Sequence, residues 1–107
     1  MKGNEGRKIM SVLHLVVKRK WFDQIVSGRK KIEYREYTPY WCKRLLMLSP
    51  AGKLIYKYFD EVSFRAGYGK SVPGAIFSLR KITIKETVHP DTGKFTFNFL
   101  IHIGGRV

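Results

Sequence analysis

Residues 27–41 read SGRKKIEYREYTPYW, a stretch in which cations and aromatic residues are closely interleaved. The segment leading into it, RKWFDQIVSG (residues 19–28), has apolar pairs four residues apart, which is typical of a short helix. Gly28 supplies a helix stop, because glycine readily adopts the left-handed conformation found after a helix C-terminus. The following KKIEYREY (residues 30–37) alternates as a strand does. Its two faces are expected to carry Ile32 and Tyr34 on one side, and Lys31, Glu33, Arg35 and Tyr37 on the other.

A second helix is predicted to begin directly after this strand. Thr38 is a good N-cap, and Pro39 suits the first helical position because its missing N–H has no helical partner to lose. An apolar stripe follows at helical spacing, formed by Trp41, Leu45 and Leu48. The segment SPAGK (residues 49–53) breaks this pattern and predicts a loop.

The flanking segments have the patterns of β-strands. VLHLVVK (residues 12–18) is rich in β-branched residues and ends in a charge, which predicts a buried strand. Alternation resumes after Tyr58, with one apolar face formed by Val62, Phe64 and Ala66. The glycine-rich segment GYGKSVPG (residues 67–74) predicts a loop.

The C-terminal third predicts two long strands. AIFSLRKITIKETV (residues 75–88) has an apolar face that changes side near Arg80, as a β-bulge or a bend would require. HPDTGK (residues 89–94) predicts a hairpin turn. The clearest alternation in the chain follows, formed by Phe95, Phe97, Phe99, Ile101 and Ile103. Together these patterns predict an α+β, mainly β fold: a small barrel of about five or six strands with two short helices in the N-terminal half.

The length of 107 residues suits one domain and is too short for two. We expect residues 1–10 to form a flexible tail and residues 11–107 to form a single domain. The one cysteine, Cys42, allows neither an intrachain disulfide nor a multi-cysteine zinc site, which favours a reducing compartment. No apolar run approaches the ~20 residues of a membrane span, and the first ten residues lack the apolar segment of a secretory signal. We therefore expect a cytoplasmic protein.

Positive charge dominates the composition. The chain has 21 Lys and Arg residues against 8 Asp and Glu residues, a formal net charge of +13. Such a chain repels itself, and a polyanionic partner relieves that repulsion. Nucleic acid is the first candidate partner, an anionic membrane surface is the second, and solubility alone is the third explanation.

The familiar catalytic and metal-binding motifs do not occur in the sequence. His14, His89 and His102 lie in separate segments without helical pairing, so we predict no metal site. Cys42 lies beside the apolar stripe and is interpreted as a packing residue. The chain has no G-x-S-x-G, H-E-x-x-H or P-loop pattern, and we expect no cofactor.

The strand within residues 27–41 is the best candidate for a binding site. Its polar face places Glu33 beside Arg35. If that face were open to solvent, the two would form a surface ion pair worth under about 1 kcal/mol. If it lined the mouth of a barrel, Glu33 would orient Arg35 and Lys30, and it would accept hydrogen bonds from a base amine or a ribose hydroxyl. Cations, a carboxylate and nearby tyrosines together suit an unstacked nucleotide. The residue pattern by itself leaves both interpretations open.

Gly28, Lys30, Glu33 and Arg35 spell G-x-K-x-x-E-x-R, which resembles the signature of the ASCH domain family, relatives of the PUA domains. The resemblance extends over HLVVKRKWFDQIVSGRKKIEYREYTPYWCKRL, which is similar to the small single-domain bacterial and phage members. It includes VSFRAGYGK, which resembles their strand and glycine loop, and so covers most of residues 13–70. The resemblance implies a PUA-like β-barrel, a cleft lined by the signature residues, and binding related to RNA.

The resemblance also implies an enzymatic alternative. Some compact members are similar to an amidohydrolase that removes acyl groups from modified cytidine with the signature lysine, a threonine nucleophile and a remote glutamate. Lys30 matches that lysine, but the threonine position aligns with Glu33, whose carboxylate has no proton for a base to remove, so this activity is disfavoured. Ribonuclease activity is a further alternative in the family. Side chains that could transfer protons or stabilise charge are Lys30, Tyr34, Tyr37 and Tyr68.

The favoured hypothesis is an RNA- or nucleotide-binding module with a basic cleft and no membrane partner. Lys30 and Arg35 would contact phosphate or a base edge, Glu33 would hold them in place, and Tyr68 would stack on a base. The residues expected to contact nucleic acid are Lys18, Lys20, Arg29, Lys30, Glu33, Arg35, Arg65, Tyr68 and Lys70. If the protein is an enzyme, Lys30 and Glu33 are the catalytic candidates. The second alternative is a protein-interaction domain whose charge serves only solubility.

Overall fold

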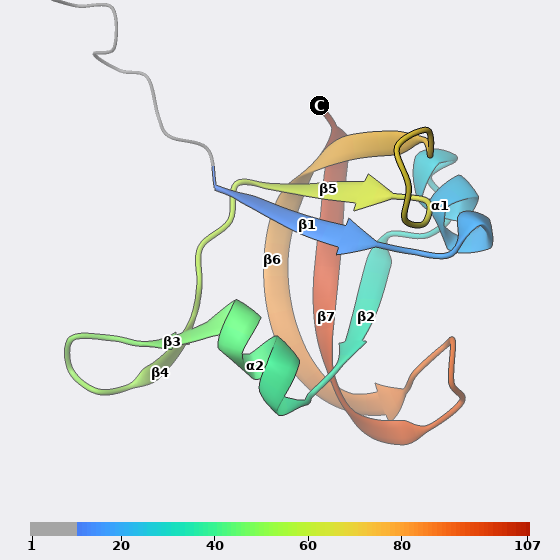
Figure 1. Ribbon diagram of the computed structural model, residues 1–107. Helices are drawn as coiled ribbons and strands as arrows, with labels where there is room; N and C mark the ends of the chain where they lie inside the picture. The colour runs from blue at the N-terminus through green and yellow to red at the C-terminus, as the bar shows by residue number, and fades with distance from the viewer. Residues whose placement is uncertain (1–10) are drawn as a thin grey trace, which may run out of the picture.

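The computed structural model describes residues 11–107, so the tail predicted for residues 1–10 lies outside the described residues. The elements in chain order are β1 (Val12–Val16), α1 (Arg19–Val26), β2 (Ile32–Glu36), α2 (Pro39–Leu45), β3 (Leu46–Leu48), β4 (Leu54–Tyr56), β5 (Glu61–Arg65), β6 (Gly74–Val88) and β7 (Phe95–Arg106). The fold is mainly β, with two short helices in the N-terminal half, as predicted (Figure 1).

Five of the strands form one mixed sheet in the order β1-β5-β6-β7-β2. β1 runs parallel to β5, and the other neighbours are antiparallel. β1 and β2 are therefore the two edges of the sheet. Within residues 11–107 they share no strand ladder, but the sheet curves so strongly that both edges come to the same side of the molecule (Figure 1). This seam between β1 and β2 is where the candidate site lies.

The curvature is built into the long ribbon formed by β6 and β7. Their pairing shifts register between Phe77 and Leu79 and again between Leu79 and Lys81. Such irregularities bend a strand and increase its twist. They fall where the apolar face of the sequence changes side near Arg80, so the predicted bulge or bend is confirmed.

One apolar cluster fills the concave side of the curved sheet. Val62 and Phe64 of β5 and Phe99 and Ile101 of β7 are fully buried at its centre. α1 covers one end of this core with the side chains of Phe22 and Ile25, and α2 covers the other with Leu45.

The helix boundaries follow the predicted signals. Gly28 has a φ of +84°, the left-handed conformation expected just past the end of α1. The Thr38 hydroxyl accepts a hydrogen bond of 3.3 Å from the Trp41 amide, and Pro39 is the first residue of α2. Both caps satisfy or remove helix-end groups that would otherwise lack partners.

The predicted apolar stripe of α2 is wrong at its last residue, Leu48. The helix ends at Leu45, and residues 46–48 instead form β3, which pairs with β4 around the turn at residues 49–53. A short apolar run such as LLML fits a strand as well as a helix, and here its last three residues pair with residues 54–56 of β4. The resulting hairpin projects from the body with most of its apolar side chains exposed (Figure 1).

The alternation of β7 is also misleading at its start. The alternation puts Phe95 and Phe97 on the same face as Phe99, but both are exposed, whereas Phe99 is buried. At Phe95 and Phe97, β7 still pairs with β6 on one side. On its other side β2 has already ended, because the pairing of β2 with β7 stops at Asn98. Phe99 is the first of these phenylalanines to be covered by another side chain, because the Tyr37 ring stacks on it at a centroid distance of 5.1 Å.

Candidate functional site

A buried ion network lies on β2 at the seam. Glu33 Oε2 is 2.9 Å from Arg35 Nη2, and Glu33 Oε1 is 3.4 Å from Lys30 Nζ. The side chains of Lys30 and Glu33 are each only 9% exposed. Burying a carboxylate is costly unless cations and hydrogen bonds compensate for the lost water, and here both oxygens face a cation.

The polar face of the strand is the more buried one. Glu33 pairs across the sheet with the fully buried Ile101, whereas Ile32 and Tyr34 on the other face are only partly buried. Arg35 likewise pairs with Phe99. The polar face of β2 therefore points to the concave side of the sheet, and the interpretation of Glu33 and Arg35 as a solvent-exposed pair is wrong.

Aromatic rings surround the two cations. Lys30 Nζ lies 4.9 Å from the ring centroid of Trp21 on α1 and 5.3 Å from that of Tyr34. The guanidinium carbon of Arg35 lies 5.1 Å from the ring centroid of Trp41 on α2. Attraction between a cation and an aromatic face is strengthened where water is excluded, so these rings hold both cations in fixed positions.

Arg35 also joins the two edges of the sheet. Its Nη2 donates a hydrogen bond of 3.0 Å to the carbonyl oxygen of Val16, the last residue of β1. Its Nε is buried, and no group within residues 11–107 accepts a hydrogen bond from it. The guanidinium is thus held by Glu33 and Val16 at one nitrogen, while its Nε–H stays buried without an acceptor among the described residues.

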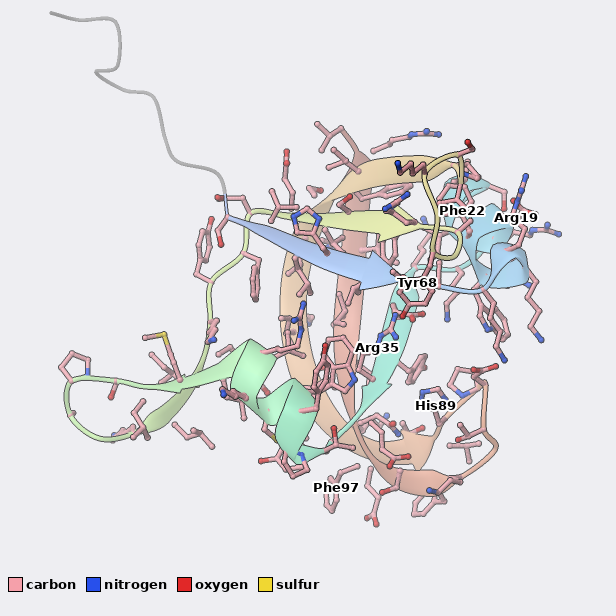
Figure 2. The ribbon with its side chains drawn as sticks, in the orientation of Figure 1. Arg19, Phe22, Arg35, Tyr68, His89 and Phe97 are labelled. Atoms are coloured by element: carbon pink, nitrogen blue, oxygen red, sulfur yellow. The ribbon has the colours of Figure 1, made fainter. Side chains whose placement is uncertain are left out.

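A cavity of about 500 Å³ opens at this seam. Its walls come from the end of β1, α1, β2, α2, the β5–β6 loop and the β6–β7 turn. Three of the lining residues, Arg35, Tyr68 and His89, are labelled in Figure 2 and come from β2, the loop and the turn respectively. Tyr68 is 88% exposed, so its ring stands free at the rim of the cavity.

The β6–β7 turn is tied down against the cavity. Asp91 Oδ1 lies 2.9 Å from Lys18 Nζ, and this hydrogen-bonded cation holds the pKa of the Asp91 carboxyl below its ordinary value. Lys94 Nζ lies 3.7 Å from Glu36 at the end of β2. The imidazole Nδ1 of His89 accepts a hydrogen bond from the Asp91 amide within the turn. These contacts fix the turn as one wall of the cavity.

The charges that line the cavity are balanced. The three cations are Lys18, Lys30 and Arg35, and the three carboxylates are Glu33, Glu36 and Asp91. The strong positive charge of the chain as a whole is therefore not concentrated in the lining. A balanced, aromatic-walled cavity suits a neutral planar group with polar edges better than it suits a bare polyphosphate.

The structure brings five of the nine predicted contact residues together in the cavity lining, namely Lys18, Lys30, Glu33, Arg35 and Tyr68. The other four, Lys20, Arg29, Arg65 and Lys70, do not line it. Lys20 instead lies over the Trp21 ring at 4.6 Å, and Arg29 donates a hydrogen bond to Ser27. Arg65 bonds the carbonyl of Gly69 and lines a separate hollow beside Arg106.

Sequence reasoning missed several lining residues, chiefly Trp21, Trp41, His89, Asp91 and Thr92. The two tryptophans were interpreted as parts of apolar helix stripes, and the other three as parts of a hairpin turn. The only local signal for the two tryptophans was a basic neighbour, since Lys20 directly precedes Trp21 and Lys43 follows Trp41 two residues later.

Across residues 11–107, no group of three or more His, Cys, Asp and Glu side chains is placed to hold a metal ion. In the same part of the chain, neither helix has the length and apolar character needed to cross a bilayer. Comparison of the chain with protein-family models, with curated proteins and with solved structures finds no match.

Proposed function

We propose that this protein is an RNA- or nucleotide-binding module that holds one unstacked nucleotide in the cavity between β1 and β2. The observation that carries the proposal is the Lys30–Glu33–Arg35 network, which is buried, surrounded by aromatic rings and exposed to an open cavity of about 500 Å³. A buried network of this kind is expensive to build, and a hydrophobic core would be as stable without it. Its cost is explained if it serves ligand binding.

Each group in the cavity has a role in the proposed complex. Glu33 accepts a hydrogen bond from a base amine through the remaining lone pairs of its carboxylate. The guanidinium of Arg35, which lines the cavity, donates to a base carbonyl or ring nitrogen. Tyr68 at the rim stacks on the base or on its neighbour. The phosphates lie outside the balanced lining, where Lys20, which packs over the ring of the lining residue Trp21, can pair with them.

We also propose that the fold is a PUA-like barrel of the ASCH type. The support for this is the convergence of Lys30, Glu33 and Arg35 of the signature on one cavity. The side-chain bridge from Arg35 to Val16 adds to it, because it brings the two edge strands together where a barrel would close.

The first test is titration of the intact protein with AMP and with a single-stranded octanucleotide RNA. AMP binding should depend weakly on salt because the lining is balanced, whereas octanucleotide binding should fall steeply between 50 and 200 mM salt as counterions return to the phosphates. No binding of either ligand at 50 mM salt would overturn the proposal.

The second test is mutation of the network. Lys30→Met and Arg35→Met should each abolish AMP binding. The matched control is Lys53→Met in the exposed turn between β3 and β4, which removes the same charge far from the cavity and should leave AMP binding unchanged. Equal losses in all three variants would show that only the overall charge matters. Turnover of modified nucleosides that disappears with Lys30→Met would instead indicate the hydrolase alternative.

A further inference from the structure

A group of exposed aromatic side chains lies at the end of the molecule where β2 leads into α2. Tyr40 is 61% exposed, Phe95 is 65% exposed and Phe97 is 51% exposed. Figure 2 shows Phe97 at this end, below the start of α2. Exposed apolar side chains that are grouped mark a binding surface more often than single ones do, and these three residues are here called the aromatic patch.

The aromatic patch reaches the wall of the cavity through Tyr40. The Tyr40 ring packs edge-on against Trp41 at a centroid distance of 5.1 Å, and Trp41 lines the cavity. On the other side, the carbonyl oxygen of Phe97 accepts a hydrogen bond of 3.0 Å from the amide of Tyr37, the residue that follows β2. A strand of nucleic acid leaving the cavity past Trp41 would therefore meet the aromatic patch next.

The charges beside the aromatic patch favour a polyanion. Arg44 lies over the rings of both Tyr40 and Trp41, at 5.5 and 5.4 Å from their centroids. Residues 37–59 contain four Lys and Arg residues and no Asp or Glu. Glu86 pairs across the ribbon with Phe97, so the phosphates are expected on the Arg44 side. Rings that bind bases together with cations that follow the backbone are the usual elements of a single-strand binding surface.

We propose that the aromatic patch is a second nucleic-acid subsite, on which the nucleotides next to the one in the cavity stack. This inference rests on the proposed function and names the form of its ligand: a single strand of several nucleotides rather than a free nucleotide. An exposed protein-docking surface is the competing explanation. The aliphatic side chains of the β3–β4 hairpin are better candidates for protein docking than the aromatic patch is. They have no π-faces on which bases could stack.

The test compares AMP with octaadenylate, whose bases stack strongly. Wild-type protein should bind octaadenylate much more tightly than AMP. Tyr40→Ala and Phe97→Ala should each weaken octaadenylate binding about tenfold and leave AMP binding unchanged, since stacking on one aromatic ring contributes about that factor. Tyr40→Phe keeps the ring and should bind as the wild type does.

Tyr58→Ala is the matched control, because Tyr58 is an even more exposed tyrosine that lies between β4 and β5, outside the aromatic patch. It should leave both affinities unchanged, and thermal melts should show that all variants are folded. If the two patch variants bind octaadenylate as tightly as the wild type, the aromatic patch is not a subsite, although the cavity proposal survives. If wild-type protein binds neither ligand, the proposed function fails and this inference fails with it.

Discussion

Glu33 Oε2 lies 2.9 Å from Arg35 Nη2, so two charged residues of one edge strand neutralise each other on the concave face of a curved sheet. With Lys30 on the other carboxylate oxygen, Glu33 is the single anion between two largely buried cations. We expect both stability and the proposed nucleotide binding to depend on this carboxylate, and the two contributions can be separated by experiment.

Glu33→Gln should lower the free energy of unfolding by about 3 kcal/mol. The amide keeps the shape of the side chain but leaves Lys30 and Arg35 buried without a countercharge, which is the costly way to break a buried ion pair. Urea unfolding measures the change. Glu86→Gln is the control, since Glu86 is exposed and its loss should change stability by less than about 0.5 kcal/mol. Similar losses in both variants would mean that the network contributes nothing special to the fold.

Arg35→Lys should loosen the seam between the two edge strands. Arg35 Nη2 contacts both Glu33 and the carbonyl of Val16, and a shorter ammonium on a flexible stem cannot hold the same pair of positions. Amide hydrogen exchange at the end of β1 should accelerate, with little change in the middle of β7. Unchanged exchange at β1 would show that the side-chain bridge is not what holds the edges together.

Stability should fall as the pH drops below about 6.5, because of His102. Burial, and then the nearby charges of Lys81 and Arg80, lower the pKa of this imidazole in the folded protein. As the pH falls, the unfolded chain therefore takes up a proton at about pH 6.5 before the folded protein does, which favours unfolding. The stability is complete above pH 6.5 and decreases down to the folded pKa.

Urea midpoints between pH 5.5 and 7.5 measure this slope. His102→Gln should flatten it while keeping a group that can hydrogen-bond to Thr83, whose hydroxyl lies 3.0 Å from the imidazole. A slope of the same size in His102→Gln would assign the effect to another group.

Gly104→Ala should destabilise the protein by about 1–3 kcal/mol, the usual cost of overpacking. A Cβ atom at Gly104 would overlap the Ser78 hydroxyl and would lie 3.2 Å from the Ser78 carbonyl oxygen. Gly105→Ala is the matched control, because a Cβ atom there meets nothing within 4 Å. Adding Ser78→Ala to Gly104→Ala should recover part of the loss in thermal unfolding. No recovery would place the strain at the Ser78 carbonyl or at the Arg80 side chain, whose Cγ would lie 3.1 Å from the added Cβ, rather than at the hydroxyl.

Much of the local structure could be predicted from the sequence, because the signals are local. The stop at Gly28, the cap at Thr38 and the face change near Arg80 each depend on neighbouring residues, and all three are confirmed. The errors at Leu48 and at Phe95 and Phe97 have a common origin. In each case the sequence has the apolar periodicity of a buried face, but no neighbouring element of the described fold covers that face, so the side chains stay exposed.

The candidate site was predicted in part for the same reason. The signature residues lie within eight positions of one another, so a strand was enough to place Glu33 beside Arg35. The tryptophans and the β6–β7 turn reach the cavity only because the curved sheet brings its two edges together, and no spacing in the sequence encodes that approach.

The sequence by itself thus determined the elements, their caps and the charged motif, since these follow from propensity and period over a few residues. Only the tertiary structure decided which face of β2 is buried, which cations line the cavity and which aromatic side chains remain exposed. Alternation of residue types shows that a strand has two different faces. Which of the two faces becomes buried depends on how strands distant in the sequence curve around that strand.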